Sequence, residues 1–492
     1  MSTKQKVIVI GAGPGGLAVA MQLSGQGYDV HIYEKAASIG GRTALLKQDG
    51  FSFDLGPTAL NMPNVITTLF ADCGRNIRDY VNLISLDPLY SLHIGDIVFN
   101  PSHDSEKTKR EIARLFPGEE ANYDRFMHDN AKKMVYLLPI WQEPFTSLWS
   151  LFSMRTLRAL PSLTLGNHLI DELSKYFEDR RLRLAFSFET KFLGMSPWET
   201  PGAFSVIPFA EHYFGVFHII GGINQLTHAM SEIVQEKGGE IHLNQEVTQI
   251  HTKHKEITSI TLANGDTIEG DYFFLNADYA YTMSHLFSES KAPISLQKLA
   301  RKKYSCSGFA IYLGLDITLP LNVHTVLFPD DFRVHMDEIM HKQRIPDDLS
   351  IHISYPTAVD RTMAPRDMSA LRILIPVPNN ESDIDWAKET QALRRKTLDT
   401  IERKLNIPDL ESHILTEKII TPYDWENDYH IYKGAIFNLT HQLSQLGPFR
   451  PSKTPAIKNM QIVGGATHPA NSLPFILESA NIAVRKFNKE HH

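Results

Sequence analysis

The sequence predicts an α/β protein with a Rossmann-type dinucleotide-binding fold. A short apolar run at residues 7–10 is typical of a buried parallel strand, and residues 30–33 are expected to form the next strand. A glycine-rich turn, Gly-Ala-Gly-Pro-Gly-Gly, follows the first strand at residues 11–16, and Glu34 follows the second. Strand, glycine turn, helix and terminal acidic residue in this order are typical of a unit that binds a pyrophosphate and a ribose.

Each part of this unit has a physical role. Gly11 allows the tight turn from strand to helix, Gly13 lets the backbone approach a pyrophosphate, and Gly16 lets the helix pack closely on the sheet. The helix is expected over residues 17–24, and its first turn offers free N–H groups to the anion. The predicted phosphate-binding loop consists of Gly11, Ala12, Gly13, Gly15 and Gly16, and Glu34 is the predicted ribose ligand.

The composition excludes several other classes of protein. The chain has 492 residues, of which 42% are hydrophobic and 21% charged, so two domains or one domain with large insertions are expected. A net charge of −7 without a dense basic cluster argues against nucleic-acid binding. Cys73 and Cys306 lie far apart, so neither disulfides nor a metal site is expected, and a reducing cytoplasm fits. Neither a cleavable signal nor a membrane-spanning helix is expected.

The pattern along the chain indicates a cofactor domain built from three separated segments, with a substrate domain inserted between them. Residues 67–220 have a mostly helical pattern, and the expected helices lie at 119–138, near 145–160 and at 167–191. Strands are expected at 240–250, 257–263 and 267–275 and, in a second sheet, at 304–316, 350–356 and 371–377. A turn at Asn264-Gly265-Asp266 is expected between 257–263 and 267–275. A last strand precedes a helix that begins at Pro474.

These patterns give five predicted ranges. Residues 1–66, 221–290 and 434–492 are the three segments of the cofactor domain, residues 67–220 form a region of substrate and membrane contact, and residues 291–433 form the substrate domain. No internal repeat or low-complexity tract interrupts this order.

Three features favour FAD over a nicotinamide cofactor. Gly41 and Arg42 follow the second strand, where the arginine can reach the pyrophosphate. Glu246 and Val247 lie on a strand that arrives from far along the chain, where its backbone edge can meet the adenine. Gly465 lies in a closing turn, and Pro474 stands at the first position of the last helix, near a capping Ser472. The positive end of that helix would stabilise the negative charge of a reduced flavin.

With these residues in place, the chain resembles the bacterial-type phytoene desaturase family of FAD-dependent carotenoid desaturases and oxidases, closest to its diapophytoene branch. The resemblance covers nearly the whole length. It rests on the glycine loop with Glu34, Gly40-Gly41-Arg42, residues 53–58 (FDLGPT), Gly221-Gly222, Asn276-Ala277-Asp278, residues 304–307 (YSCS), residues 421–424 (TPYD), residues 434–436 (GAI), residues 449–451 (FRP) and Thr467-His468-Pro469. The Asn-Ala-Asp and Thr-His-Pro elements are the more specific ones.

The resemblance implies a glutathione-reductase-like FAD domain, an inserted mixed α/β substrate domain and a helical membrane-contact region. It implies FAD contacts at Gly11, Gly13, Gly16, Glu34, Arg42, Val247 and Gly465, and it places Pro57, Thr58 and the loop from His468 through Leu473 to Pro474 beside the flavin ring. The chain departs from the family at Ala470 and Asn471, where glycines are usual. The loop path near the flavin is therefore expected to differ.

The implied reaction is the desaturation of a linear carotene, such as phytoene or diapophytoene, by hydride transfer to flavin. The protein then aligns the chain and excludes water, and no catalytic triad is expected. His468 is the candidate proton acceptor or ring-orienting group, and a structural role in the loop is the alternative. Glu478 is either its partner or, as we expect, a charge on the helix surface.

Terminal-methyl oxygenation and carotene isomerisation remain open as reactions within the family. Outside it, the alternatives are a flavin amine oxidase, for which the sequence lacks a recognisable lysine and aromatic cage, and a non-catalytic flavoprotein. The sequence leaves the oligomeric state open, and it allows either oxygen or a quinone as electron acceptor.

A long apolar substrate dissolves in membranes, and residues 139–161 fit contact with a bilayer. The segment carries apolar side chains at helical spacing and two arginines that can meet lipid phosphates. These residues are Trp141, Phe145, Leu148, Trp149, Phe152, Met154, Leu157 and Leu160, with Arg155 and Arg158. The expected location is the cytoplasm, at the inner face of the cell membrane.

Overall fold

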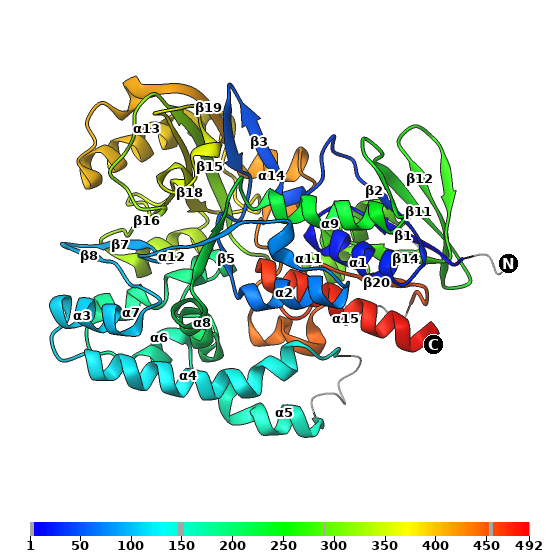
Figure 1. The fold of residues 1–492 in the computed structure, drawn as a ribbon, viewed down its shortest axis with the longest axis horizontal. Helices are drawn as coiled ribbons and strands as arrows, with labels where there is room; N and C mark the ends of the chain where they lie inside the picture. Colours follow the sequence, from blue (N-terminus) through cyan, green and yellow to red (C-terminus); the bar gives the residue numbers. More distant parts are fainter. Residues whose placement is uncertain (1–3, 146–151, 165, 290, 452–455, 492) are drawn as a thin grey trace.

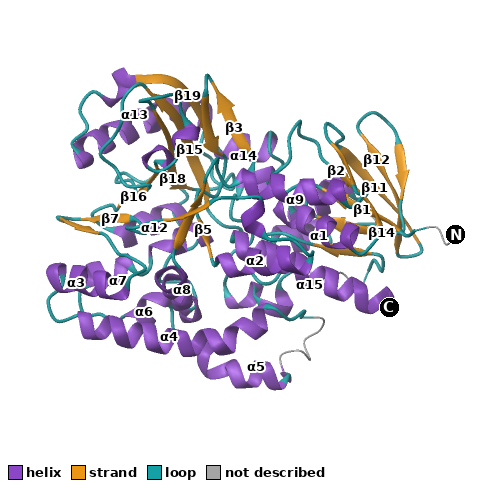
Figure 2. Cartoon of the chain, viewed as in Figure 1, coloured by secondary structure: helices purple, strands orange, loops and turns teal. Residues whose placement is uncertain are grey.

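The computed structural model describes residues 4–145, 152–164, 166–289, 291–451 and 456–491. It forms two lobes, with a parallel sheet and its covering helices in one and a large mixed sheet and a group of helices in the other (Figure 1). Figure 2 shows that strands dominate the upper part of the second lobe, whereas its lower part is helical.

A five-stranded parallel sheet forms the centre of the first lobe, in the order β10-β2-β1-β14-β20. Its strands are β1 (Lys6–Ile10), β2 (Asp29–Tyr33), β10 (Glu240–His242), β14 (Tyr272–Leu275) and β20 (Met460–Ile462). They come from three stretches that lie far apart in the sequence. We propose the five-range division of the chain on this basis.

Both faces of this sheet are buried, which explains the unbroken apolar runs that the sequence shows. On one face Val7 and Val9 pack among the helices α1 (Pro14–Gly25), α9 (Asn224–Glu236) and α15 (Leu473–His491). On the other face Ile8 and Ile10 pack against a three-stranded antiparallel sheet of β11 (Val247–Lys253), β12 (Glu256–Leu262) and β13 (Thr267–Glu269). The expected turn at residues 264–266 joins β12 to β13.

Two of the expected strands are wrong as single elements. The stretch 240–250 divides into β10 and β11, because Asn244 has φ +54° and Gln245 donates to the carbonyl oxygen of Glu34 at 2.8 Å. The stretch 267–275 divides into β13 and β14 near Gly270, so that its two halves lie in different sheets. The break moves the chain from the parallel sheet to the antiparallel one and back.

A seven-stranded mixed sheet forms the core of the second lobe, in the order β19-β15-β18-β17-β16-β7-β8. Its strands are β7 (Ser91–Ile94), β8 (Ile97–Phe99), β15 (Ser307–Leu315), β16 (His324–Leu327), β17 (Ile351–Ser354), β18 (Ser369–Val377) and β19 (Ile414–Ile420). One face packs on α13 (Trp386–Leu405) through a continuous apolar layer. The opposite face looks toward the first lobe and, as shown below, toward a cavity.

The helical part of this lobe lies at its lower side (Figure 2). Its helices are α3 (Ser105–Leu115), α4 (Glu120–Trp141), α5 (Met154–Ala159), α6 (Leu169–Leu173), α7 (Arg180–Ala185) and α8 (Val206–Phe214). The helix expected over 167–191 is broken, because the Asp179 side chain accepts a hydrogen bond from the Arg181 amide at 2.7 Å and starts α7 anew. No helix of the described chain is long and apolar enough to cross a bilayer.

The remaining elements connect the two lobes or cover their surfaces. They are α2 (Pro63–Asp72), α10 (Tyr279–Tyr281), α11 (Leu296–Ala300), α12 (Phe332–Met340) and α14 (Pro422–Asn427), the hairpin β3 (Leu45–Gln48) and β4 (Phe51–Asp54), and the small sheet of β5 (Leu60–Asn61), β6 (Leu83–Ser85) and β9 (Val216–Ile219).

Candidate functional site

A cavity of about 590 Å³ is lined by residues of both lobes. This volume lies within the range of about 300–1,000 Å³ that is typical of small-molecule sites. At one end the cavity reaches the glycine loop after β1, and at the other it reaches the inner face of the seven-stranded sheet. Apolar side chains make up most of its lining.

The glycine loop is built so that side chains are excluded. Gly11 has φ +97°, and its amide donates to the carbonyl oxygen of Tyr33 at 2.8 Å. A Cβ atom on Gly16 would lie 2.2 Å from the carbonyl oxygen of Gly11, and one on Gly13 would lie 2.7 Å from Oδ1 of Asn276. Gly13 is also the N-cap of α1 and has no side chain to cap it, which leaves the first N–H groups of the helix free.

Asn276 is a site residue for which the sequence analysis predicted no role. It follows β14 directly and lines the cavity beside Gly11 and Gly13. Its Nδ2 donates to the carbonyl oxygen of Val463 at 3.3 Å, whereas its buried Oδ1 has no partner in the described chain. Its position at the carboxyl edge of a parallel strand was the signal that could have found it, because ligands of open α/β sheets bind at that edge.

Glu34 is buried and lines the cavity at the end of β2. Its carboxylate accepts hydrogen bonds from the amides of Ala12, at 2.8 Å, and Ala36, at 2.9 Å. Each oxygen keeps a further lone pair, so the carboxylate can also accept from a ribose hydroxyl. Ala12, Gly15 and Gly16 are not among the cavity-lining residues; Ala12 binds Glu34, Gly15 faces the Asn276 amide, and Gly16 packs on the carbonyl oxygen of Gly11.

A buried guanidinium stands at the same end of the cavity. Gly41 and Arg42 both line it, and Nη1 of Arg42 donates to the carbonyl oxygen of Ile436 at 2.7 Å. Burial lowers the pKa of Arg42, and the nearby Asp278 carboxylate opposes that shift. Val247, the first residue of β11, lines the cavity as well.

The flavin-side segments also meet at the cavity. Pro57 and Thr58, which precede β5, line it together with Gly465, Leu473 and Pro474. Leu473 and Pro474 are the first residues of α15, so the positive end of that helix faces the cavity. Neither Ala470 nor Asn471 has a positive φ; the turn places its positive φ at Gly464, +119°.

Arg450 holds this turn in place, a role that the sequence analysis did not predict. Its guanidinium donates to the carbonyl oxygens of Gly465 and Thr467, both at 3.0 Å, and to that of Thr440 at 3.2 Å. Burial lowers the pKa of Arg450 to about 9. The buried arginine therefore ties the closing turn to the loop that carries Thr440.

His468 does not line the cavity. Its Nε2 lies 3.0 Å from the carbonyl oxygen of Ile140, and its ring packs edge-on against Phe145 with the centroids 4.9 Å apart. Burial lowers the pKa of His468 to about 4, so the ring is neutral at pH 7 and Nε2 is the donor. This position agrees with a structural role of His468 in the loop. It gives the ring no contact with the cavity, which a proton acceptor would need.

Glu478 is not a surface charge, and that expectation is wrong. Its carboxylate is 7% exposed and accepts from Asn481 Nδ2 and from Arg485 Nη2, both at 3.1 Å. Arg485 also donates to the carbonyl oxygen of Gln142, at the end of α4. The pair therefore binds α15 to α4, which a single sequence could not indicate because the partners belong to distant segments.

The far end of the cavity carries polar groups that the sequence analysis did not predict. Six polar residues line it among apolar ones: Asn61, Glu189, Glu211, His324, His352 and Arg372. Glu211, on α8, accepts from Asn61 Nδ2 at 2.9 Å, and the Tyr90 hydroxyl is a second side-chain partner of its carboxylate. The available signal was a histidine or arginine among the mostly apolar residues of each strand, at 324, 352 and 372.

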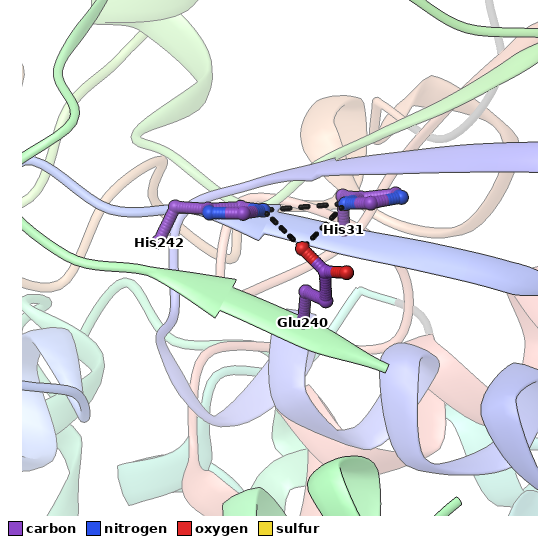
Figure 3. Close-up of side chains that lie close together, drawn as sticks. All are labelled: His31, Glu240 and His242. Atoms are coloured by element: carbon purple, nitrogen blue, oxygen red, sulfur yellow. Dashed lines mark hydrogen bonds and ion pairs between the residues drawn. The ribbon is translucent and has the colours of Figure 1, made fainter. Parts of the chain in front are cut away.

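One group of metal-ligand residue types also appears outside the cavity, where the sequence predicted no metal site. His31 on β2 and Glu240 and His242 on β10 meet at the edge of the parallel sheet (Figure 3). His31 Nδ1 lies 3.2 Å from His242 Nε2 and 3.5 Å from the Glu240 carboxylate. Glu240 is exposed, and these direct contacts between the side chains join the edge strand β10 to β2.

The residues at the first end of the cavity fit FAD. The free N–H groups of α1 and the Arg42 guanidinium suit a pyrophosphate, the Glu34 carboxylate suits a ribose, and the start of α15 suits the flavin ring. The unpartnered Oδ1 of Asn276 and the space that a Cβ on Gly13 would fill mark where a ligand approaches the backbone.

Comparison with known proteins agrees with this geometry. The family model of the flavin containing amine oxidoreductases matches residues 14–480. A 4,4'-diapophytoene desaturase (4,4'-diapolycopene-forming) of Methylomonas sp is 38% identical, and the alignment covers 100% of this chain and 96% of that protein. A zeta-carotene-forming phytoene desaturase of Myxococcus xanthus is 34% identical over 98% and 93% of the two chains.

Solved structures match the fold. An oxidoreductase from Methanosarcina mazei superposes with a TM-score of 0.66 at 16% identity, covering 98% of this chain and 100% of that one. A putrescine oxidase superposes with a TM-score of 0.63 at 13% identity, covering 99% and 98%. At these identities the likeness concerns the fold alone. The family match, the identities to the two desaturases and the fit of the site residues to FAD lead to one conclusion. The chain belongs to the flavin-containing amine oxidoreductases and, within them, to the FAD-dependent carotenoid desaturases.

Proposed function

We propose that the protein introduces double bonds into a linear thirty-carbon carotene of the diapophytoene type. The observation that carries the proposal is the cavity, which continues from the FAD-binding loop to a largely apolar region under the seven-stranded sheet. The diapophytoene desaturase of Methylomonas supports the shorter substrate, since it is the more similar of the two relatives compared above.

The chain's own residues would bind and orient both reactants. Bound FAD supplies the acceptor for a hydride from the polyene. Gly11, Gly13, Glu34 and Arg42 would hold the cofactor at one end. Phe188, Phe192 and Leu374 line the other part of the cavity, where they would align the polyene and exclude water.

The neighbouring carbon must lose a proton, and Glu211 is the group that we propose accepts it. Glu211 lines the cavity, the Asn61 amide fixes its carboxylate through Oε1, and the Tyr90 hydroxyl is a second side-chain partner. Asn61 is three residues from Thr58, which is at most about 10 Å of extended chain, so the partner of Glu211 follows the flavin-side segment directly. Burial raises the pKa of Glu211 well above its usual value, which makes its carboxylate a stronger base.

We also propose that the region around α5 contacts the membrane from which the substrate comes. Phe152, Met154, Leu157 and Leu160 are 42–67% exposed, and Arg155 and Arg158 stand among them. Trp141 and Phe145 instead pack inward, against Phe475 and His468, and Leu148 and Trp149 lie outside the described residues. Amphipathic segments of this kind bind the interface of a bilayer without crossing it.

The test uses purified protein with bound FAD in liposomes that contain diapophytoene, phytoene or a fully desaturated carotene. We expect products that are two hydrogens lighter, with red-shifted absorption, and faster conversion of diapophytoene. A product with added oxygen would indicate the terminal-methyl oxygenase, and an unchanged mass with altered retention would indicate the isomerase. Oxygen or a quinone is proposed as the electron acceptor, which supplying each alone would decide.

A further inference from the structure

The inner face of the seven-stranded sheet carries buried polar side chains, several of whose nitrogen atoms have no hydrogen-bond partner in the described chain. His324 on β16, His352 on β17 and Arg372 on β18 are all at least nine-tenths buried and line the cavity. Both ring nitrogens of His324, Nδ1 of His352 and Nε of Arg372 have no hydrogen-bond partner in the described part of the protein. Their neighbours on the same sheet face, Val326 and Leu374, are apolar.

These three side chains form one group. The rings of His324 and His352 are stacked with their centroids 5.4 Å apart. Ser354 on β17 is the register partner both of His324 on β16 and of Arg372 on β18. His352 lies two residues from Ser354 on the same strand, so His324, His352 and Arg372 share one face of the sheet. The ring of Phe192 borders the group, 5.2 Å from His352.

The group belongs to the substrate end of the cavity. Its strands belong to the seven-stranded sheet, whereas the glycine loop, Glu34 and Asn276 belong to the parallel sheet of the other lobe. The buried Lys191 side chain lies over the Phe188 and Phe192 rings. Burial lowers the pKa of His352 well below its usual value, and the nearby His324, Lys191 and Arg372 act in the same direction. Burial lowers the pKa of His324 to about 3, so each imidazole is neutral and offers one N–H donor.

A hydrocarbon leaves all of these donors unsatisfied. Each buried donor without a partner costs about 1–3 kcal/mol, and a CH group cannot accept its hydrogen bond. A hydroxyl or carbonyl oxygen can accept from an imidazole N–H and from the guanidinium Nε–H together. A long polyene with such an oxygen at one end fits the apolar and the polar lining at once.

We propose that His324, His352 and Arg372 form a subsite for an oxygen-bearing end group, a hydroxyl or a carbonyl, of a linear carotenoid. The enzyme then binds an end-oxygenated polyene more tightly than the hydrocarbon of the same length. This inference rests on the proposed function, in that it takes the ligand of the cavity to be a polyene. It requires no chemical step at the oxygen.

The experiment measures binding to the FAD-loaded protein in detergent micelles, without turnover. The probes are a fully conjugated C30 hydrocarbon and the same skeleton with a terminal alcohol or aldehyde, followed by the shift of polyene absorption. At least tenfold tighter binding of the oxygenated polyenes is expected. Equal affinity would mean that water satisfies the polar face and would overturn the proposal.

Two variants and one control assign the preference to the site. His324→Leu combined with His352→Leu should abolish the preference and leave hydrocarbon binding equal or tighter. His352→Gln, which keeps an N–H donor, should retain most of it. The control is His335→Leu, which removes a buried histidine of α12 that does not line the cavity and should leave the preference unchanged.

Persistence of the preference in the double leucine variant would refute the assignment. FAD content and melting temperature, measured on every variant, separate loss of folding from loss of binding. The desaturation assay with diapophytoene is performed in parallel. If desaturation fails while the binding preference is observed, the proposed function is wrong and the subsite is supported. If desaturation is observed without a binding preference, only the subsite is wrong.

Discussion

Replacing Gly16 by alanine tests the packing of the glycine loop most sharply. The added Cβ would lie 2.2 Å from the carbonyl oxygen of Gly11, whereas real Cβ contacts essentially never fall below 3.0 Å. Because that oxygen is backbone, α1 must move away from β1. Such overpacking costs about 1–3 kcal/mol, and it displaces the helix N-terminus that faces the pyrophosphate.

The expected result is a weaker hold on FAD. A loss of about 1.4–3 kcal/mol corresponds to an affinity for FAD that is roughly 10- to 150-fold lower. Isothermal titration of the flavin-free protein with FAD measures the affinity, and thermal melting measures the stability. The matched control is Gly25→Ala in the same helix, where a Cβ meets nothing within 4 Å. That change should raise stability by about 0.5–1 kcal/mol and leave FAD binding intact. Unchanged FAD affinity in Gly16→Ala would refute the packing argument.

The remaining predictions concern four other parts of the molecule. Burial lowers the pKa of His468 from 6.5 to about 4, so near pH 5 the unfolded chain binds a proton that the folded chain does not. The contribution of this residue to the free energy of unfolding should therefore fall by about 2 kcal/mol as the pH is lowered from 8 to 5. His468→Gln should remove that pH dependence from the melting temperature and keep desaturation per bound FAD; a collapse of turnover with FAD retained would restore a catalytic role. Glu211→Gln should lower the rate of desaturation at least 100-fold with FAD bound. Because the pKa of Glu211 is raised, its carboxyl loses the proton only above the usual pH range, so wild-type activity should rise with pH. A pH profile without this rise would contradict the role of Glu211. Arg450→Met removes a donor from five backbone carbonyl oxygens, of which that of Thr440 keeps the Gln445 side chain as a partner, and should cost at least about 3 kcal/mol in chemical denaturation. Leu157→Asp should reduce co-flotation with anionic vesicles without changing the melting temperature; undiminished flotation would move the membrane contact elsewhere.

The sequence predicted the parts of the site that depend on local geometry. Gly11, Gly13 and Gly16 lie in the loop between β1 and α1, and Glu34 ends β2, because turn conformation and strand order constrain these positions directly. Pro474 stands at the start of α15 for the same reason. The parallel sheet and the inserted sheet were predictable from the mostly apolar runs.

The residues that the sequence analysis missed, or placed wrongly, depend on contacts between distant segments. Arg450 and the turn that it holds, and the pair of Glu478 and Arg485 with its link to α4, become visible only when the chain is folded. His324 and His352 lie on adjacent strands that a loop and a helix separate in the sequence. The local sequence pattern does not indicate that these two histidines lie buried beside a cavity. One histidine in a mostly apolar strand was therefore not enough to predict a polar subsite.

The removal of hydrogen from a bound polyene by the FAD-loaded protein tests the account most directly. The purified yellow protein is mixed with one equivalent of diapophytoene in the absence of oxygen, and flavin absorption and product mass are recorded together. We expect the flavin to bleach and the polyene to lose two mass units in equal amounts. A protein that holds FAD firmly, binds the polyene and leaves both unchanged would contradict the account.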